Sequence, residues 1–99
     1  MPPAFYNLYW ENKLIGRVNN PEPIDFPWMA GNLGDASLDA ELHEVMKHTL
    51  RQAESEDESF DWPFPERFME SWKLVDDSGE ESQICMPIID IVAGTIEWR

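Results

Sequence analysis

The chain is poor in the features that cross-link a protein, anchor it or target it. Its single cysteine, Cys85, cannot form an internal disulfide. No apolar run approaches the ~20 residues that a helix needs to cross a bilayer. The first ten residues carry no basic cluster and are interrupted by Pro2, Pro3 and Asn7, which is unlike a signal peptide. These absences predict a protein of a reducing, cytoplasmic compartment that does not bind membranes.

Basic residues are also scarce, because seven Lys and Arg stand against twenty Asp and Glu, for a formal net charge of −13. Positions 54–81 alone hold eleven acids and two bases. Such a surface repels nucleic acids and anionic lipids, which proteins normally bind with Lys and Arg clusters. We therefore expect no direct nucleic-acid binding. A basic protein partner fits the charge, and so does a solvated face that only maintains solubility.

Apolar and aromatic side chains, in contrast, are plentiful, at 42% and 12% of the residues. Disordered chains lack them, because they cannot bury enough apolar surface to offset the entropy of the chain. The length suits one hydrophobic core and is too short for two. Residues 1–99 are therefore predicted to form a single acidic domain.

Alternation of side chains predicts a β-hairpin at the start of the chain, with strands over 4–10 and 13–18. In the second strand the alternation places Leu14, Gly16 and Val18 on one face. The composition of the next five residues, with two Asn and two Pro, predicts a turn.

A short third strand is predicted over 24–31, with Pro27 at an edge or a bulge. An amphipathic helix over 37–53 follows, with Asp35 or Ser37 as its N-cap. Its apolar stripe consists of Leu38, Leu42, Val45, Met46, Thr49, Leu50 and Ala53.

Strand patterns resume after the helix. Trp72 and Leu74 alternate with polar residues, and the glycine of the segment 77–80 predicts a turn. The apolar stretch 82–92 predicts a strand with Ile84, Met86 and Ile88 facing one way, and 95–99 can pair back with Ile96 and Trp98 inward. The prediction is an α+β fold of order β-β-(β)-α-β-β-β, an antiparallel sheet of about five to six strands with one helix packed on one face.

No metal site is predicted from the histidines. His43 and His48 are five residues apart, which separates them by roughly 140° around a helix axis. Glu44 and His48 share a face, but one carboxylate and one imidazole make a partial site, so a surface salt bridge is the simpler interpretation. The acids around Gly79 lack the ligand spacing of a calcium loop.

The sequence points to no cofactor and to no catalytic residue. Cys85 has no histidine near it in sequence, and alternation places it opposite Ile84 and Met86, so a packed, inert thiol is expected. A glycine-rich phosphate loop and a nucleophile motif are both absent from the sequence.

Two similar segments, Asp25-Phe26-Pro27-Trp28 and Asp61-Trp62-Pro63-Phe64-Pro65, place prolines among aromatic rings in predicted connections. If these rings are exposed, they mark a binding surface, and if they are covered, they complete a small core. The candidate partner-binding residues are Phe26, Trp28, Trp62, Phe64, Asp76, Asp77, Glu80 and Glu81.

These features together favour a protein–protein interaction or inhibitor-type module that binds a basic protein or a second copy of itself. The alternative is a small-ligand-binding or enzymatic domain with a pocket between helix and sheet. Mimicry of nucleic acid is a third interpretation. A strand over 68–76 opposes it, because such a strand would hold the acidic clusters at its two ends ~30 Å apart.

Overall fold

A β-hairpin opens the protein, in a computed structural model that describes residues 3–54 and 64–99. Strand β1 (Phe5–Trp10) pairs with β2 (Lys13–Asp25), and the two turn residues between them both have positive φ, as tight hairpin turns require. The first predicted hairpin is thus confirmed. The other elements are β3 (Trp28–Gly34), α1 (Ala40–Glu54), the short 3-10 helix η1 (Glu66–Met69), β4 (Trp72–Asp76), β5 (Glu81–Gln83), β6 (Ile88–Asp90) and β7 (Thr95–Trp98).

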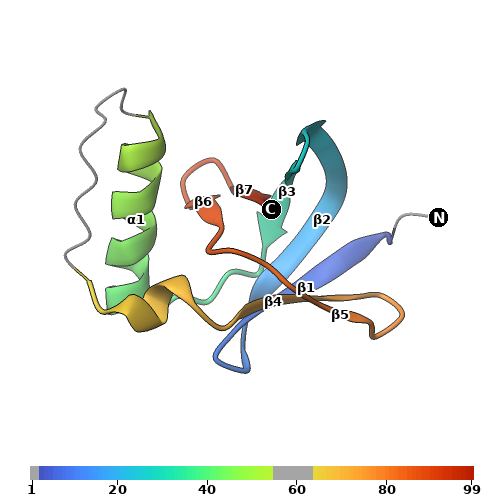
Figure 1. The fold of residues 1–99 in the computed structure, drawn as a ribbon, viewed down its shortest axis with the longest axis horizontal. Coiled ribbons are helices and arrows are strands. Elements are labelled where there is room, and N and C mark those ends of the chain that lie inside the picture. Colours follow the sequence, from blue (N-terminus) through green and yellow to red (C-terminus); the bar gives the residue numbers. More distant parts are fainter. Residues whose placement is uncertain (1–2, 55–63) are drawn as a thin grey trace.

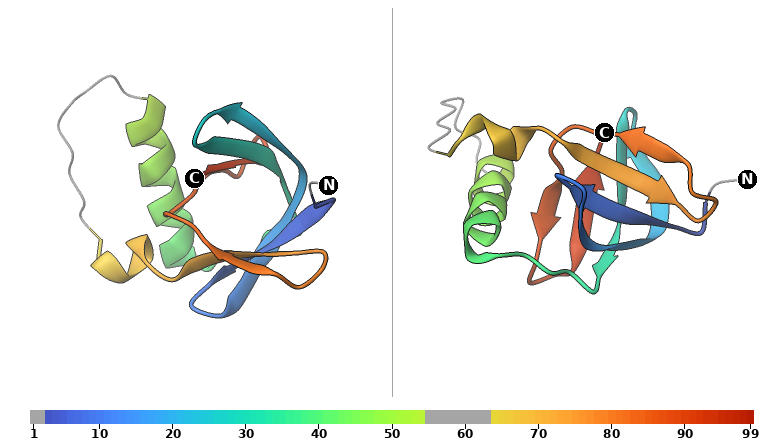
Figure 2. Two further views of the ribbon diagram at one scale, coloured as in Figure 1. Left: turned by 45° about the vertical axis from the view of Figure 1, so that its right-hand side comes forward. Right: turned by 90° about the horizontal axis from the view of Figure 1, so that it is seen from below.

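The seven strands of the described residues belong to one antiparallel sheet in the order β5-β4-β1-β2-β3-β7-β6. Helix α1 packs against this sheet, chiefly against β6 (Figure 1). The predicted α+β fold is confirmed, although the sheet has more strands than expected. Figure 2 shows that the sheet curves strongly around its concave face.

The core is built from the inward side chains of the strands and from one stripe of the helix. Tyr6, Leu8 and Trp10 alternate inward from β1, and Ile96 and Trp98 from β7, as their period of two predicts. The other buried apolar residues are Ile15, Val18, Leu33, Leu42, Val45, Met46, Phe68, Trp72, Leu74 and Ile89.

The prediction that Leu14 shares one face of the second strand with Gly16 and Val18 is wrong. A bulge places Ile15 as an extra residue in β2, because Leu8 pairs with Gly16 while Tyr9 pairs with Leu14. The insertion turns Ile15 into the core and leaves Leu14 51% exposed.

The turn predicted after Val18 is also wrong, because β2 continues to Asp25 and reverses only at Phe26 and Pro27. The peptide bond between these two residues is cis. Beyond Asn19, β2 is paired only with β3, so the missing N–H groups of Pro21 and Pro23 can face the open side without loss of a ladder bond.

Helix α1 begins three residues later than predicted, and its cap is neither Asp35 nor Ser37. The backbone N–H of Leu42 donates to Oδ1 of Asp39 at 2.8 Å, which makes Asp39 the N-cap. The strand imagined over 68–76 is shorter as well, because β4 begins at Trp72, after η1.

The apolar stretch 82–92 is divided between β5 and β6, which lie on opposite edges of the sheet. The connection runs from one edge toward the other. Its Ile84 N–H donates to the Trp72 carbonyl, and its Cys85 N–H donates to the Arg99 carbonyl, both at 3.1 Å. Ile89, rather than Ile88, is the buried residue of β6, because the crossing resets the alternation.

Candidate functional site

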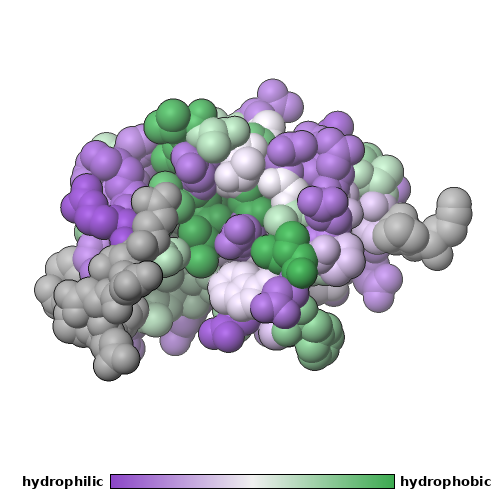
Figure 3. Space-filling view, turned by 90° about the horizontal axis from the view of Figure 1, so that it is seen from above, coloured by the Kyte–Doolittle hydropathy of each residue, from purple (hydrophilic) through white to green (hydrophobic). Residues whose placement is uncertain are grey.

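The most exposed aromatic ring of the described structure lies at the tip of the β2–β3 hairpin. Phe26 is 96% exposed, and Ile24 beside it is 50% exposed. The tip projects from the sheet because β2 and β3 stay paired with each other beyond the point where β1 ends. Figure 3 shows the molecule from above Figure 1, the side on which this tip lies, with apolar surface broken by hydrophilic side chains. An exposed apolar cluster on a paired hairpin is suited to insertion into a partner.

Trp28, at the base of the same tip, is partly covered. The guanidinium carbon of Arg99 lies 5.2 Å from the centre of the Trp28 ring, a cation–π contact. The structure therefore groups Phe26 and Trp28 on one hairpin, with Ile24 and Arg99 as neighbours that the sequence pattern did not single out. The one feature of the sequence that could have indicated Ile24 is its position as an apolar residue between Pro23 and Asp25.

The second proline–aromatic segment behaves differently. Trp62 lies outside the described residues. Phe64 packs against the core, with its ring centre 5.5 Å from that of His48 and 6.5 Å from that of Phe68, both edge-on. This ring therefore helps to complete the core, which is the second of the two roles expected for such a segment.

The acidic turn between β4 and β5 is organised by Asp76. Its Oδ1 accepts hydrogen bonds from the Ser78 hydroxyl at 2.7 Å and from the backbone N–H groups of Ser78 and Glu80, both at 2.9 Å. The bond from the Ser78 hydroxyl, followed by that from the Glu80 N–H, lowers the pKa of Asp76. Asp76 thus organises the backbone of this turn.

The other three acids of this turn differ in their freedom. Asp77 accepts a hydrogen bond from the Ala4 N–H at 3.2 Å, and Glu81 forms an ion pair with Lys73 at 2.8 Å. Glu80 uses its backbone in the turn, and its side chain is exposed. Burial, then the carboxylates of Asp76, Asp77 and Glu80, raises the pKa of Tyr6.

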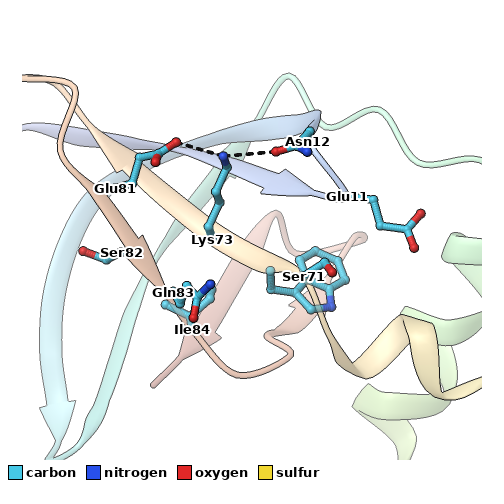
Figure 4. A pocket seen from close by; sticks show the side chains of 9 residues that line it. Glu11, Asn12, Ser71, Lys73, Glu81, Ser82, Gln83 and Ile84 are labelled. Carbon is cyan, nitrogen blue, oxygen red and sulfur yellow. Dashed lines mark hydrogen bonds and ion pairs between the residues drawn. The ribbon is translucent and has the colours of Figure 1, made fainter.

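A cavity of about 560 Å³ lies between the β1–β2 turn and the paired strands β4 and β5, with Glu81 on its wall. Figure 4 shows Lys73 at its centre, where Nζ donates to Oδ1 of Asn12 at 3.2 Å and to Glu81 at 2.8 Å. The lysine charge is therefore already neutralised, and Glu11 adds a further carboxylate to the wall. The cavity suits a cationic or neutral polar group better than an anion.

A smaller cavity of about 270 Å³ lies between the C-terminal half of α1 and strands β6 and β7. Its walls carry Leu50, Ile88, Asp90 and Glu97. Ligand pockets usually measure ~300–1,000 Å³, so this groove is small for a substrate. Asp90 accepts a hydrogen bond from the Ala93 N–H at 3.0 Å, which gives it a role in the turn.

Among residues 3–54 and 64–99, no group of three His, Cys, Asp or Glu side chains is arranged to hold a metal ion. Lys47 lies 3.6 Å from Glu44, and the His48 ring contacts Phe64. The expectation of a packed Cys85 is wrong, because its side chain is exposed. Ile84, Met86 and Pro87 take the inward positions of this connection, which leaves Cys85 outward.

The fold and this surface define a small acidic α+β domain, in which one helix packs against a curved antiparallel sheet and a hairpin presents an aromatic tip. Comparisons with models of known protein families, with characterised proteins and with solved structures found no match. Within the part of the chain that the structure describes, no helix is both long and apolar enough to pass through a membrane.

Proposed function

We propose that this protein is an interaction or inhibitor-type module that binds a basic protein partner through the β2–β3 hairpin. The observation that carries the proposal is Phe26, 96% exposed at the hairpin tip, with Ile24 beside it. An aromatic side chain has few rotatable bonds, so it contributes a large contact area at a low entropic cost. A ring at the centre of an interface then controls how slowly a complex dissociates.

The charge of the domain supports a basic partner. Its cations are largely engaged within the molecule. Arg67 lies 3.4 Å from Glu11 and 3.1 Å from Glu41, and Arg17 lies 4.3 Å from the centre of the Phe5 ring. With a net charge of −13, the surface field is negative and attracts basic proteins over distance. Self-association is less favoured, because two such surfaces repel each other.

The alternative of a pocket-based function has weaker support. The groove between helix and sheet measures about 270 Å³, below the ~300–1,000 Å³ that is usual for ligand pockets. An interaction surface needs no cavity.

A reducing, cytoplasmic compartment suits this module. Cys85 is exposed and unpaired. In an oxidising compartment an exposed thiol forms intermolecular disulfides, whereas the cytosol keeps it reduced.

The test compares the protein with its Phe26→Ser variant as baits in affinity capture from the source cell. Val92→Ser is the matched control, because Val92 is also fully exposed but lies in the β6–β7 turn. We expect a basic protein to bind the wild type and Val92→Ser and to be lost from Phe26→Ser. With that partner purified, Phe26→Ser should weaken binding by about tenfold or more. Equal binding of all three baits would refute the proposal.

A further inference from the structure

One edge of the sheet is open. Strand β5 pairs only with β4, and among the described residues no strand lies on its other side. The opposite edge, formed by β6, is in contact with α1. Open edges present unpaired backbone groups that can bind another extended chain.

The pairing of β5 shows which backbone groups are open. Asp76 N–H donates to the Glu80 carbonyl at 3.0 Å, and Ile84 N–H donates to the Trp72 carbonyl at 3.1 Å. In an antiparallel ladder, every second residue is bonded to the same neighbour. Ser82 therefore points its backbone groups toward β4, whereas Glu81 and Gln83 point theirs away. All three residues of β5 are exposed.

The protein already uses the continuation of this edge. Cys85 is the next residue in the outward series, and its N–H donates to the Arg99 carbonyl at 3.1 Å. The residue that follows β7 therefore occupies the edge at Cys85 and leaves Gln83 and Glu81 open further along. An incoming strand would lie along β5 from this point.

The same residue connects the edge to the hairpin tip. The backbone of Arg99 bonds to Cys85, and its guanidinium covers the Trp28 ring at 5.2 Å. Gln83 is two residues from Cys85, within about 7 Å along an extended chain. Arg99 therefore contacts both the continuation of this edge and the base of the β2–β3 hairpin tip.

The charges on this edge favour a basic occupant. Glu81 begins β5, Glu80 directly precedes it, and Glu11 lines the adjoining cavity. The nearby cation Lys73 is paired with Glu81. A second copy of this strand would bring these carboxylates together, which is unfavourable.

We propose that the partner contributes an extended segment rich in Lys and Arg, which adds to β5 as an eighth strand. Its backbone bonds to the outward N–H and C=O groups of Glu81 and Gln83, and its cations lie near Glu80 and Glu81. This inference rests on the proposed function and specifies the form of the partner at the interface.

The probe is a synthetic peptide with Lys alternating with Val and Thr. Two control peptides carry Glu in place of each Lys, or N-methyl groups along one edge. Titration is followed by NMR of the backbone amides, with hydrogen exchange at Glu81 and Gln83. We expect saturable, salt-sensitive binding by the Lys peptide, slower exchange at both amides, and no binding by either control peptide.

The matched variants are Gln83→Pro and Gln83→Ala. Proline removes an outward N–H that β4 does not use, whereas alanine keeps it. We expect Gln83→Pro to weaken peptide binding by about tenfold, because one hydrogen bond is lost and the proline ring obstructs the incoming strand. Gln83→Ala should bind the peptide like the wild type. If Gln83→Pro does not fold, the N-methylated peptide tests the same ladder through its other bonds, those that the peptide N–H groups donate to the outward carbonyls of Glu81 and Gln83.

Absence of saturable binding at millimolar peptide would overturn the inference, as would equal binding by Gln83→Pro or by the N-methylated peptide. Slow exchange at Glu81 and Gln83 in concentrated protein without peptide would also overturn it, because a second copy would then fill the edge. Failure here is separate from failure of the proposed function. A partner that depends on Phe26 but leaves exchange at Glu81 and Gln83 unchanged would refute the eighth strand alone.

Discussion

Truncation of Leu42 to alanine tests whether α1 is held to the sheet by its apolar stripe. Leu42 is 1% exposed, and the neighbouring Val45 and Met46 are fully buried. Removal of a buried leucine side chain costs ~2–5 kcal/mol, because transfer energy is lost and a cavity remains. Total stability of a domain is only ~5–15 kcal/mol, so Leu42→Ala should lose a large part of it.

The assay is urea unfolding followed by tryptophan fluorescence and by far-UV circular dichroism. With a slope of ~1–3 kcal/mol per M, a loss near 3 kcal/mol lowers the midpoint by about 1–3 M. Leu14→Ala is the matched control, because Leu14 is 51% exposed, and it should change stability by less than ~1 kcal/mol. Equal midpoints for Leu42→Ala and the wild type would refute the packing of this helix face on the sheet.

Two further predictions concern the acidic turn and the hairpin. The pKa of Asp76 is lowered in the folded protein, so its stabilisation is complete above the ordinary pKa of 3.8 and is lost as the pH falls through the lower folded value. Asp76→Ala should therefore have a lower melting temperature than the wild type at neutral pH, and the difference should narrow in acid. A difference in melting temperature that does not depend on pH would contradict this role. The double variant Asp77→Asn/Glu80→Gln should slow association with the basic partner and flatten its salt dependence, whereas Trp28→Ala should speed dissociation. Stopped-flow mixing separates the two, and a change of dissociation alone in the double variant would contradict steering.

Local chemistry was enough to predict much of the fold. The first hairpin follows from alternation on both sides of a turn in which Asn12 tolerates positive φ, and α1 follows from apolar residues three and four positions apart. Gly79, with φ of 92°, marks the β4–β5 turn, and Ile96 and Trp98 face inward as alternation predicts. In each case the information lies within a few residues, so the sequence pattern specifies the backbone directly.

Other features depend on partners that lie far apart in the chain. The bulge at Ile15 reverses an alternation that nothing local disturbs, and β2 passes through Pro21 and Pro23 only because its neighbour on that side has ended. The stretch 82–92 is divided because its two halves find different edges of the sheet. A strand pattern states that a segment is extended, but it does not state which strand pairs with it.

The candidate site shows the same division. From the sequence alone, the Phe26 and Phe64 segments were equivalent, each a proline beside aromatic rings. Tertiary structure decided between them, because Phe64 meets His48 and Phe68, whereas Phe26 stands at a hairpin tip with almost no cover. Composition determined that the domain is acidic and rich in rings. Which ring is covered, and which carboxylate is engaged, depended on contacts between distant residues, and those exist only once the chain has folded.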